Sequence, residues 1–212
     1  MTVRTPVSSN GLWCVLLAAG GSRRLGYPKQ LIRDPVRPMI LRAVDAAEAV
    51  TPDRVLVVLG AHSLRLRALL ARNHDNLTVV RNASWQDGIA SSLIAGVNAV
   101  PAEARGVLVL LTDQPGIGAT SLRRLVEAWQ RRPNRAVAAG YEGGLGVPAI
   151  LPRRIWRRLR ELEGDVGAKA VLSNAGSSTI VLSMPEAAFD VDTSDDVTKS
   201  YRAPLRQFLS RS

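Results

Sequence analysis

The chain has 212 residues, which is enough for one α/β domain with a full hydrophobic core or at most two small ones. Its 46% hydrophobic content is typical of a globular protein and excludes disorder as the dominant state. The net charge of +10 favours an anionic partner, such as nucleic acid, a membrane surface or a phosphorylated small molecule. Aromatic residues make up only 4% of the chain and are not interleaved with basic runs, which argues against base-stacking recognition of nucleic acid.

The sequence carries neither a disulfide framework nor a membrane signal. Its single cysteine, Cys14, lies in a predicted strand, so we expect a buried small hydrophobe in a reducing compartment. No apolar stretch reaches the ~18 residues that span a bilayer, and the N-terminus lacks the pattern of a signal peptide. These features predict a cytoplasmic protein with no membrane partner.

The first predicted element is a buried parallel strand over Leu12–Ala18, after a frayed start over residues 1–11. It leads into a turn with two adjacent glycines and a serine, followed by Arg24 and Lys29. Glycines let the backbone approach a bulky anion, successive N–H groups form an anion-binding concavity, and the two side chains add charge. The alternative is an ordinary strand-to-helix loop with solvated basic residues. We favour phosphate binding, with the candidate nucleotide ligands Leu17, Ala18, Ala19, Gly20, Gly21, Ser22, Arg24 and Lys29.

Strands and helices then alternate regularly. The sequence predicts a helix over Met39–Val50, a wholly apolar strand to Leu59, a helix over Ser63–Arg72 capped by Ser63, and a strand over Leu77–Arg81. This alternation predicts a mostly parallel, doubly wound, Rossmann-like sheet in a three-layer α/β/α arrangement. Ligands of such sheets lie beyond the carboxyl ends of the strands, so we sought the site in those loops.

A polar segment follows the third strand. Asn82 begins it, Gly88 leaves room for a flat ligand, and Ser91 and Ser92 offer neutral hydrogen bonds that suit a nucleobase edge or a ribose. In the alternative interpretation, Asp87 and the serines only cap the helix that runs to Val100. Together with the glycine turn, the segment favours nucleotide binding.

The strongest central strand, Gly106–Thr112, ends in Asp113 and Gln114. Mg²⁺ takes hard oxygen ligands and usually binds one or two carboxylates together with substrate phosphates. A carboxylate at the carboxyl edge of the sheet faces the same crevice as the glycine turn, so Asp113 is our first candidate metal ligand. Alternatively, it caps the predicted helix that runs to Trp129.

Beyond residue 135 the pattern changes. The expected elements are a strand over Ala136–Tyr141, a hairpin-like excursion to Leu151, a basic helix from Arg153 to about Leu162, a helix over Val166–Ser173, strands over Ser178–Leu182 and Ala188–Val191, and a final packing helix from about residue 194 to Leu209. Alternation along an extended segment places Asp190 and Asp192 on the same face. The following Thr193 or Ser194, with the acids after it, suits a helix start.

Other chemistries have little support. His62 and His74 stand in separate, surface-like segments with no cysteine or carboxylate at ligand spacing, which disfavours a zinc site or a Ser-His-Asp triad. The chain shows no internal repeat and no low-complexity linker, so we expect a single domain over residues 12–212.

Five segments resemble the nucleotidyltransferases related to molybdenum cofactor cytidylyltransferase. The glycine turn is similar to L-A-A-G-x-S-x-R-[ML]-G-x-P-K and lacks the G-K-[ST] ending of a P-loop. The segment from Asn82 to Gly96 resembles N-x-x-W-x-x-G-x-x-x-S-L-x-x-G, and D-Q-P follows the central strand. G-x-P at Gly146 and G-D-x-G-A at Gly164 are similar to the region that receives the second substrate, although many relatives have His at position 147 in place of Val. The last segment, Asp190–Val197, is close to D-[IV]-D-T-P-E-D-L.

The resemblance implies a fold of the nucleotide-diphospho-sugar transferase type and transfer of CMP from CTP to molybdopterin, with release of pyrophosphate. It implies Mg²⁺ held by Asp113 and Asp192, and catalysis by Arg24, Lys29 and Asp113. The nucleotide would bind to residues of about 12–134 and the acceptor to about 135–193. The implied acceptor ligands are Gln114, Gly146, Pro148, Asp165 and Gly167, of which Asp165 could instead be only a helix cap.

Several alternatives remain at this stage. Cytidine is favoured over guanosine by Ala19, since guanylyltransferases of this cofactor pathway more often read L-A-G-G, and the segment around Trp85 supports the choice. A guanylyltransferase or a transferase to another small phosphorylated acceptor, such as a sugar phosphate, is the nearest rival. Another alternative is a basic nucleic-acid-binding protein, which we disfavour. The last is a catalytically idle scaffold for a molybdoenzyme. In the main interpretation, a molybdoenzyme is instead the partner that receives the finished cofactor.

Overall fold

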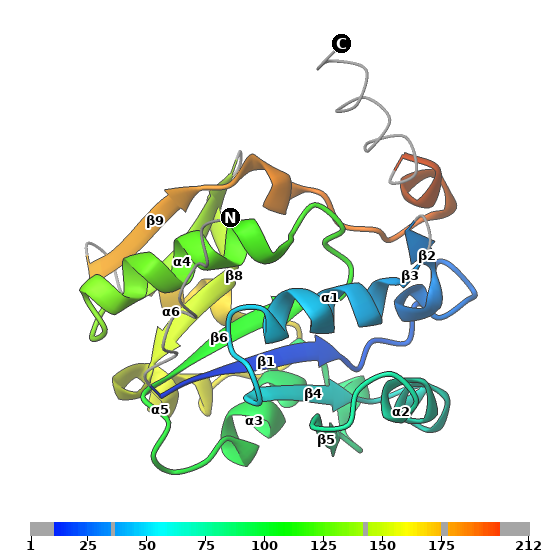
Figure 1. Cartoon of the computed structure of the whole chain (residues 1–212), viewed down its shortest axis with the longest axis horizontal. Helices are drawn as coiled ribbons and strands as arrows, with labels where there is room; N and C mark the ends of the chain where they lie inside the picture. Colours follow the sequence, from blue (N-terminus) through cyan, green and yellow to red (C-terminus); the bar gives the residue numbers. More distant parts are fainter. Residues whose placement is uncertain (1–10, 35–36, 142–143, 175–177, 200–212) are drawn as a thin grey trace, which may run out of the picture.

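The computed structural model describes residues 11–34, 37–141, 144–174 and 178–199, and a seven-stranded sheet forms its centre (Figure 1). The strands, in their order across the sheet, are β5 (Thr78–Arg81), β4 (Val55–Leu59), β1 (Leu12–Ala18), β6 (Gly106–Leu111), β8 (Gly144–Pro152), β7 (Ala136–Tyr141) and β9 (Thr179–Ser183). Every neighbouring pair is parallel except those of β8, which runs antiparallel to both β6 and β7. The predicted mostly parallel sheet is confirmed.

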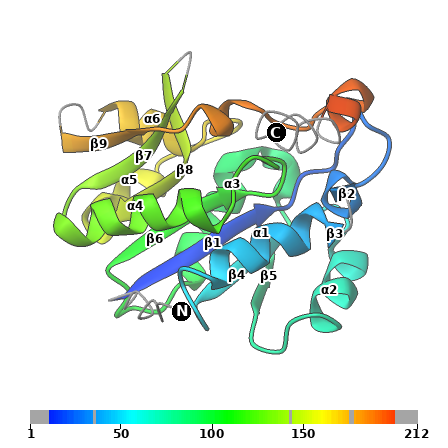
Figure 2. The ribbon, with the colours of Figure 1, turned by 45° about the horizontal axis from the view of Figure 1, so that its top comes forward.

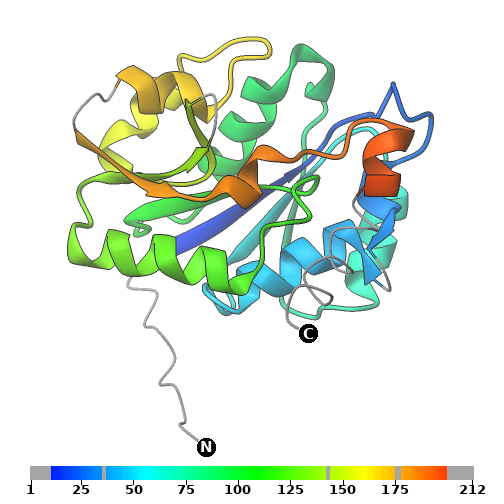
Figure 3. The same cartoon turned by 90° about the horizontal axis from the view of Figure 1, so that it is seen from above.

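Helices cover both faces of the sheet (Figures 2 and 3). One face carries α1 (Met39–Glu48), α2 (Ser63–Ala71) and α4 (Ala119–Arg131). The other carries α3 (Ile89–Ala99), α5 (Trp156–Leu159) and α6 (Ala168–Asn174). The three-layer arrangement predicted from the strand–helix alternation is therefore confirmed.

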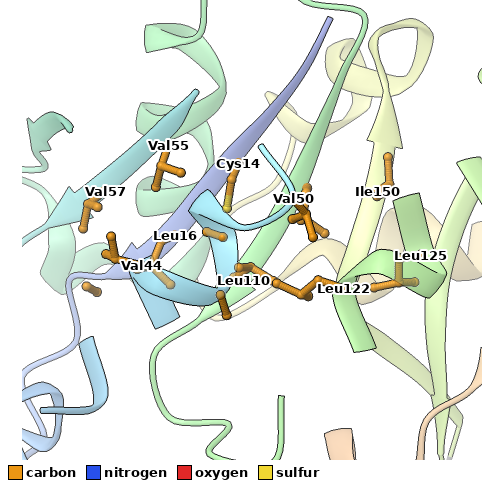
Figure 4. Close-up of a cluster of buried hydrophobic side chains, with 14 of the residues drawn as sticks. Cys14, Leu16, Val44, Val50, Val55, Val57, Leu110, Leu122, Leu125 and Ile150 are labelled. Carbon is orange, nitrogen blue, oxygen red and sulfur yellow. The ribbon is translucent and has the colours of Figure 1, made fainter. Parts of the chain in front are cut away.

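The apolar strands are buried because each contributes side chains to both cores. Along β1, Cys14 and Leu16 point to the layer of α1 and α4, whereas Val15 and Leu17 point to the layer of α3. Figure 4 shows the first of these cores, in which Val44 of α1 and Leu122 of α4 close over the strands. Burial raises the pKa of the Cys14 thiol, so this residue behaves as the small hydrophobe that was expected.

The C-terminal part departs from the sequence predictions. The strand expected over Ala188–Val191 is wrong: Pro185–Ala188 forms a 3₁₀ turn, and residues 189–193 after it are neither helix nor strand. Pro185 explains the turn, since proline fixes φ near the helical value and its missing N–H is tolerated in a first turn. The chain then passes the end of β6, where the Val191 N–H donates to the Asp113 carbonyl (2.9 Å).

Element boundaries also shift. The basic helix is shorter than predicted, because a 3₁₀ turn over Arg153–Ile155 precedes α5, and α6 begins at Ala168. Ser63 is not the cap of α2: the cap position is His62, with no side-chain bond. A two-stranded ribbon of β2 (Arg33–Asp34) and β3 (Arg37–Pro38) was not predicted.

The two ends of the chain lie largely outside the described residues. Residues 194–199 are helical, as expected for the start of the last helix, and the remainder of that predicted helix lies beyond them. Among the described residues, no helix has the length and apolarity needed to cross a membrane.

Candidate active site

A pocket of about 340 Å³ lies at the carboxyl edge of the sheet. It is lined by Leu17 and Ala18 at the end of β1 and by Leu111 at the end of β6. The glycine turn forms one wall, and the segments around Trp85 and Asp113 form others. Of the residues expected to bind the nucleotide or the acceptor, those that line this pocket are Leu17, Ala18, Ala19, Gly20, Gly21, Lys29, Gly88, Ser92, Asp113 and Asp165.

A buried glutamine braces the glycine turn. The side-chain Nε2 of Gln30 donates to the carbonyls of Ala18 (3.1 Å) and Gly20 (2.9 Å), and Gln30 is only 1% exposed. Ser22, at φ 50°, accepts a bond on Oγ from the Lys29 N–H (3.0 Å), so its side chain closes the turn and does not line the pocket. Sequence reasoning missed Gln30, although a polar residue next to Lys29 that can reach two free carbonyls is a signal for it.

Glycines are required where the pocket walls approach each other. A Cβ on Gly60 would lie 2.5 Å from the Ala19 carbonyl oxygen, and one on Gly21 would lie 3.0 Å from the Trp85 ring. The turn therefore packs directly on the Trp85 segment. Gly60 was not predicted as part of the site, because its role depends on contacts with segments distant in sequence.

Charged side chains from three distant segments meet beside the pocket. Lys29 Nζ donates to Asp113 Oδ2 (2.5 Å) and to Asp192 Oδ1 (2.9 Å). Arg24 Nη2 donates to Asp192 Oδ2 (2.8 Å). The structure thus brings together four predicted residues, although Arg24 and Asp192 stand at the rim and do not line the pocket.

The electrostatics of this cluster follow from its geometry. Burial would lower the pKa of Lys29, but the charges and hydrogen bonds of Asp113 and Asp192 outweigh it and raise that pKa. The hydrogen bond from Lys29 lowers the pKa of Asp192, against the effect of its partial burial, and Arg24 contributes further. Both shifts favour the charged forms, that is the protonated Lys29 and the ionised Asp192.

A third carboxyl, that of Asp190, faces the same cluster. Partial burial and then the charge of Asp113 raise its pKa to about 6, against a hydrogen bond from Gln114. Burial and the charge of Asp190 also raise the pKa of Tyr141. Asp190 was expected only to share a face with Asp192, and its place beside Asp113 was not predicted.

The residues of the Asn82 segment divide into two groups. Asn82 Nδ2 donates to Ser91 Oγ (2.8 Å) and Ser92 Oγ (3.0 Å), and Ser91 Oγ donates to the carbonyls of Ser84 (2.8 Å) and Gly88 (2.9 Å). Asn82 and Ser91 hold the turn, whereas Gly88 and Ser92 line the pocket. The capping alternative is wrong: Gly88 occupies the cap position of α3, which has no side-chain cap bond. The alternative that Asp113 caps α4 is also wrong, since the cap position of that helix is Gly118.

The residues expected to bind the acceptor also divide. Gly146 and Gly167 line a second pocket of about 110 Å³, together with Tyr141 and Lys169. The two pockets adjoin, since Leu17, Ile89 and Leu111 line both.

The other expected acceptor ligands lie elsewhere. Gln114 is buried and donates to the carbonyls of Val147 (3.2 Å) and Ala187 (3.0 Å), and neither Gln114 nor Pro148 lines either of these two pockets. Asp165 lines the first pocket and precedes the start of α6 by three residues, so it is not the residue directly before that helix.

Comparison with known proteins agrees with this geometry. The family model described as a MobA-like NTP transferase domain matches residues 14–179. The chain is 33% identical over 191 residues to nicotine blue oxidoreductase of Paenarthrobacter nicotinovorans, covering 87% of this chain and 88% of that one. It is 38% identical over 119 residues to the bifunctional protein GlmU of Xylella fastidiosa, covering 55% of this chain but only 25% of GlmU.

Solved structures add a similar fold. The crystal structure of Rv0371c from Mycobacterium tuberculosis superposes with a TM-score of 0.79 at 28% identity, covering 92% of this chain and 100% of that one. A manganese complex of the same mycobacterial protein superposes with a TM-score of 0.73 at 25% identity, covering 92% and 99%. Since the family model spans most of the sheet and the whole pocket wall, the chain belongs to the MobA-like NTP transferase family and is a nucleotidyltransferase by that membership.

Proposed function

We propose that the protein transfers CMP from CTP to a phosphorylated acceptor, molybdopterin, and releases pyrophosphate in a Mg²⁺-dependent reaction. The observation that carries the proposal is the convergence of Arg24, Lys29, Asp113 and Asp192 beside a pocket walled by the glycine turn. This set offers positive charge for a triphosphate and hard oxygen ligands for a divalent cation. The manganese complex of the mycobacterial neighbour supports a divalent metal.

The carboxylates of Asp113 and Asp192 fit such a cation. Asp113 Oδ1 is buried and has no hydrogen-bond partner among the described residues, as a metal-binding oxygen awaiting its ligand would. Asp113 and Asp192 would hold the metal, which when bound supplies positive charge that orients and neutralises the phosphates. Lys29 lies between the two carboxylates, so we infer that its ammonium turns from them to the phosphates when the nucleotide enters.

The chemistry requires positioning more than proton transfer. A phosphate oxygen of the acceptor attacks the α-phosphorus of CTP, and the bond from that phosphorus to the pyrophosphate oxygen breaks. Arg24, Lys29 and the N–H groups of the turn stabilise the negative charge that develops on pyrophosphate. Because the acceptor phosphate is already ionised at neutral pH, no general base is needed.

The two adjoining pockets suggest where each substrate binds. We place the nucleobase against Ala19, Gly88 and Ser92, with Ala19 favouring cytidine over guanosine. The acceptor would enter the pocket of Gly146 and Gly167, where Val147 replaces the histidine of many relatives. In this proposal residues of about 12–134 bind the nucleotide and those of about 135–193 the acceptor, within one cytoplasmic domain that passes the product to a molybdoenzyme.

Ligand selectivity tests the proposal directly. A ligand that binds the native state raises the unfolding midpoint by mass action, so thermal shift with Mg²⁺ and CTP, GTP, ATP or UTP measures base preference. A Mg²⁺-dependent shift with CTP alone, followed by pyrophosphate release with molybdopterin, is the expected result. A shift with GTP would identify a guanylyltransferase, and no shift with any nucleotide would overturn the proposal.

The metal assignment has its own test. Asp113→Asn keeps the size of the side chain but removes the charge, so turnover at saturating Mg²⁺ should fall by about a hundredfold or more. Glu103→Gln, which changes an exposed acid outside both pockets, is the matched control and should retain activity. Near-normal turnover of Asp113→Asn would exclude Asp113 as a metal ligand.

A second candidate rests on the relative from Paenarthrobacter, which is named as an oxidoreductase and matches over 87% of the chain. In this alternative, the adjoining pockets would hold nicotine blue and an electron donor. Reduction of nicotine blue with NADH or NADPH, followed by absorbance, decides between the two. Dye reduction in a protein that shows no CTP-dependent pyrophosphate release would favour the oxidoreductase.

A further inference from the structure

Three metal-ligating side chains meet outside the candidate active site, where α1 faces the segment between α2 and β5. Asp45 and Glu48 are three residues apart in α1 and so project from one face of the helix. His74 approaches both: Nδ1 lies 3.1 Å from Glu48 Oε2, and Nε2 lies 3.6 Å from Asp45 Oδ1. One ligand atom from each side chain can be chosen so that all three lie within 4.8 Å of one another. The spacing of residues along the chain gave no sign of this cluster, because His74 lies 26 positions or more from Glu48 and Asp45.

The imidazole of His74 is buried and directed into this cluster. Its side chain is only 7% exposed, and Nε2 has no hydrogen-bond partner within the described part of the chain. A buried ring nitrogen without a partner is unfavourable unless a ligand satisfies it. Nε2 points toward Asp45 Oδ1, while the Arg37 guanidinium lies against the other oxygen, Oδ2, at 3.0 Å.

The charge and access of the cluster suit a dication. The carboxylates of Asp45 and Glu48 face one guanidinium, that of Arg37, so the cluster keeps an excess of negative charge that a bound cation would compensate. The side chains of Asp45 and Glu48 are 44% and 34% exposed, which leaves one side of the cluster open to solvent and to a water ligand. Neither of the two pockets of the candidate active site includes any of these residues.

We propose that Asp45, Glu48 and His74 bind a divalent transition-metal ion, with zinc as the best match. Zinc takes imidazole nitrogen together with carboxylate oxygen in four-coordinate sites, whereas Mg²⁺ and Ca²⁺ take oxygen almost exclusively. Water would complete the coordination on the exposed side. The site holds α1 to the segment after α2, and it is independent of the proposed nucleotide transfer.

Calorimetric titration of the full chain with zinc chloride alone tests this site. His74→Gln can still donate a hydrogen bond to Glu48 but is a poor metal ligand, so zinc affinity should fall by at least about tenfold. His62→Gln is the matched control, since His62 also has a buried, unpartnered Nε2 among the described residues but no carboxylate cluster. Asp113→Asn removes a proposed metal ligand of the active site, so any zinc bound there is lost while the zinc bound through His74 remains. His62→Gln should bind zinc as the wild type does.

Cobalt(II) provides a second readout, because visible absorption reports a low-coordinate site with a nitrogen ligand. The cobalt bands should appear in the wild type and be absent in His74→Gln, while the metal-free unfolding midpoints of the two proteins show that both are folded. Zinc binding to the Asp113→Asn protein that survives the addition of His74→Gln would overturn the proposal, because the active-site metal cannot contribute there. So would the absence of zinc binding to the Asp113→Asn protein.

Discussion

Lys29 joins the two carboxylates that we propose to bind the metal, and its ammonium lies where a cation would be attracted. In Lys29→Met this competitor is gone, so metal binding in the absence of nucleotide should strengthen by roughly tenfold, or about 1.4 kcal/mol. Turnover should nevertheless fall by about a hundredfold, since charge on the pyrophosphate loses its partner. Manganese binding followed by electron paramagnetic resonance, together with pyrophosphate release, measures the two opposite changes. Lys199→Met, at an exposed lysine, should change neither.

A second residue-scale prediction concerns Asp190, whose carboxyl faces Asp113 although much of the residue is exposed. Its pKa rises from 3.8 to about 6 on folding, so the folded state disfavours the charged form. The resulting loss of stability is absent below pH 3.8, develops between that pH and about 6, and is complete above it. At pH 8, the free energy of unfolding of Asp190→Asn should therefore exceed that of the wild type by about 1 kcal/mol after allowing for solvent screening, so the variant unfolds at a higher urea concentration. This difference in free energy should vanish near pH 4.

The control for this pH dependence is Glu103→Gln, an exposed acid whose effect should be the same at both pH values. A stability gain for Asp190→Asn that persists at pH 4 would show that packing, and not ionisation, separates the variants.

At the scale of elements, two glycines of the pocket wall have different roles. Gly88 occupies the cap position of α3 at φ 97°, and a Cβ there would lie 2.2 Å from the Gly164 carbonyl group, in the loop before α6. Gly20 lies in the turn after β1, and a Cβ there would meet nothing within 4 Å. Gly88→Ala should thus reduce the free energy of unfolding by roughly 1–3 kcal/mol. Gly20→Ala should leave that free energy within about 1 kcal/mol and weaken only CTP binding.

Urea denaturation and nucleotide titration of both variants measure this contrast. The Ala90 N–H donates to the Gly164 carbonyl (3.1 Å), so displacing Gly164 would also separate α3 from the loop that carries Asp165 into the pocket. If Gly88→Ala were as stable as the wild type, the close approach between these elements would not be what requires glycine at position 88.

The same elements show what sequence reasoning can reach. An apolar run such as Val55–Leu59 is expected to be buried on both faces, and an amphipathic helix such as α4 is expected to cover a sheet with its apolar side. The three-layer arrangement was therefore predictable. The segment after β9 was not, because its apolar residues suggested a strand while Pro185 favours a 3₁₀ turn. Ion pairs between distant segments are harder to predict than elements, because Lys29 is 163 residues from Asp192 and only the fold brings the two together. The resemblance to a family implied that both belong to the site, but the spacing of the residues did not.

At the scale of the whole molecule, the net charge of +10 raises the question of nucleic acid. The arginines of α5 are exposed, and Arg157 pairs with Glu161 across one helical turn, as on a solvated face. We therefore expect duplex DNA to bind only through its phosphates, with an affinity that falls by about 10³ or more between 50 and 200 mM salt. Binding of Mg²⁺ and CTP, confined to one pocket, should fall much less and should remain selective for the base at each salt concentration. Fluorescence anisotropy with labelled DNA, run beside CTP titrations at matched salt, measures how steeply each affinity falls with salt concentration. DNA binding that resisted salt and excluded CTP would assign the basic surface, and not the pocket, as the principal binding site.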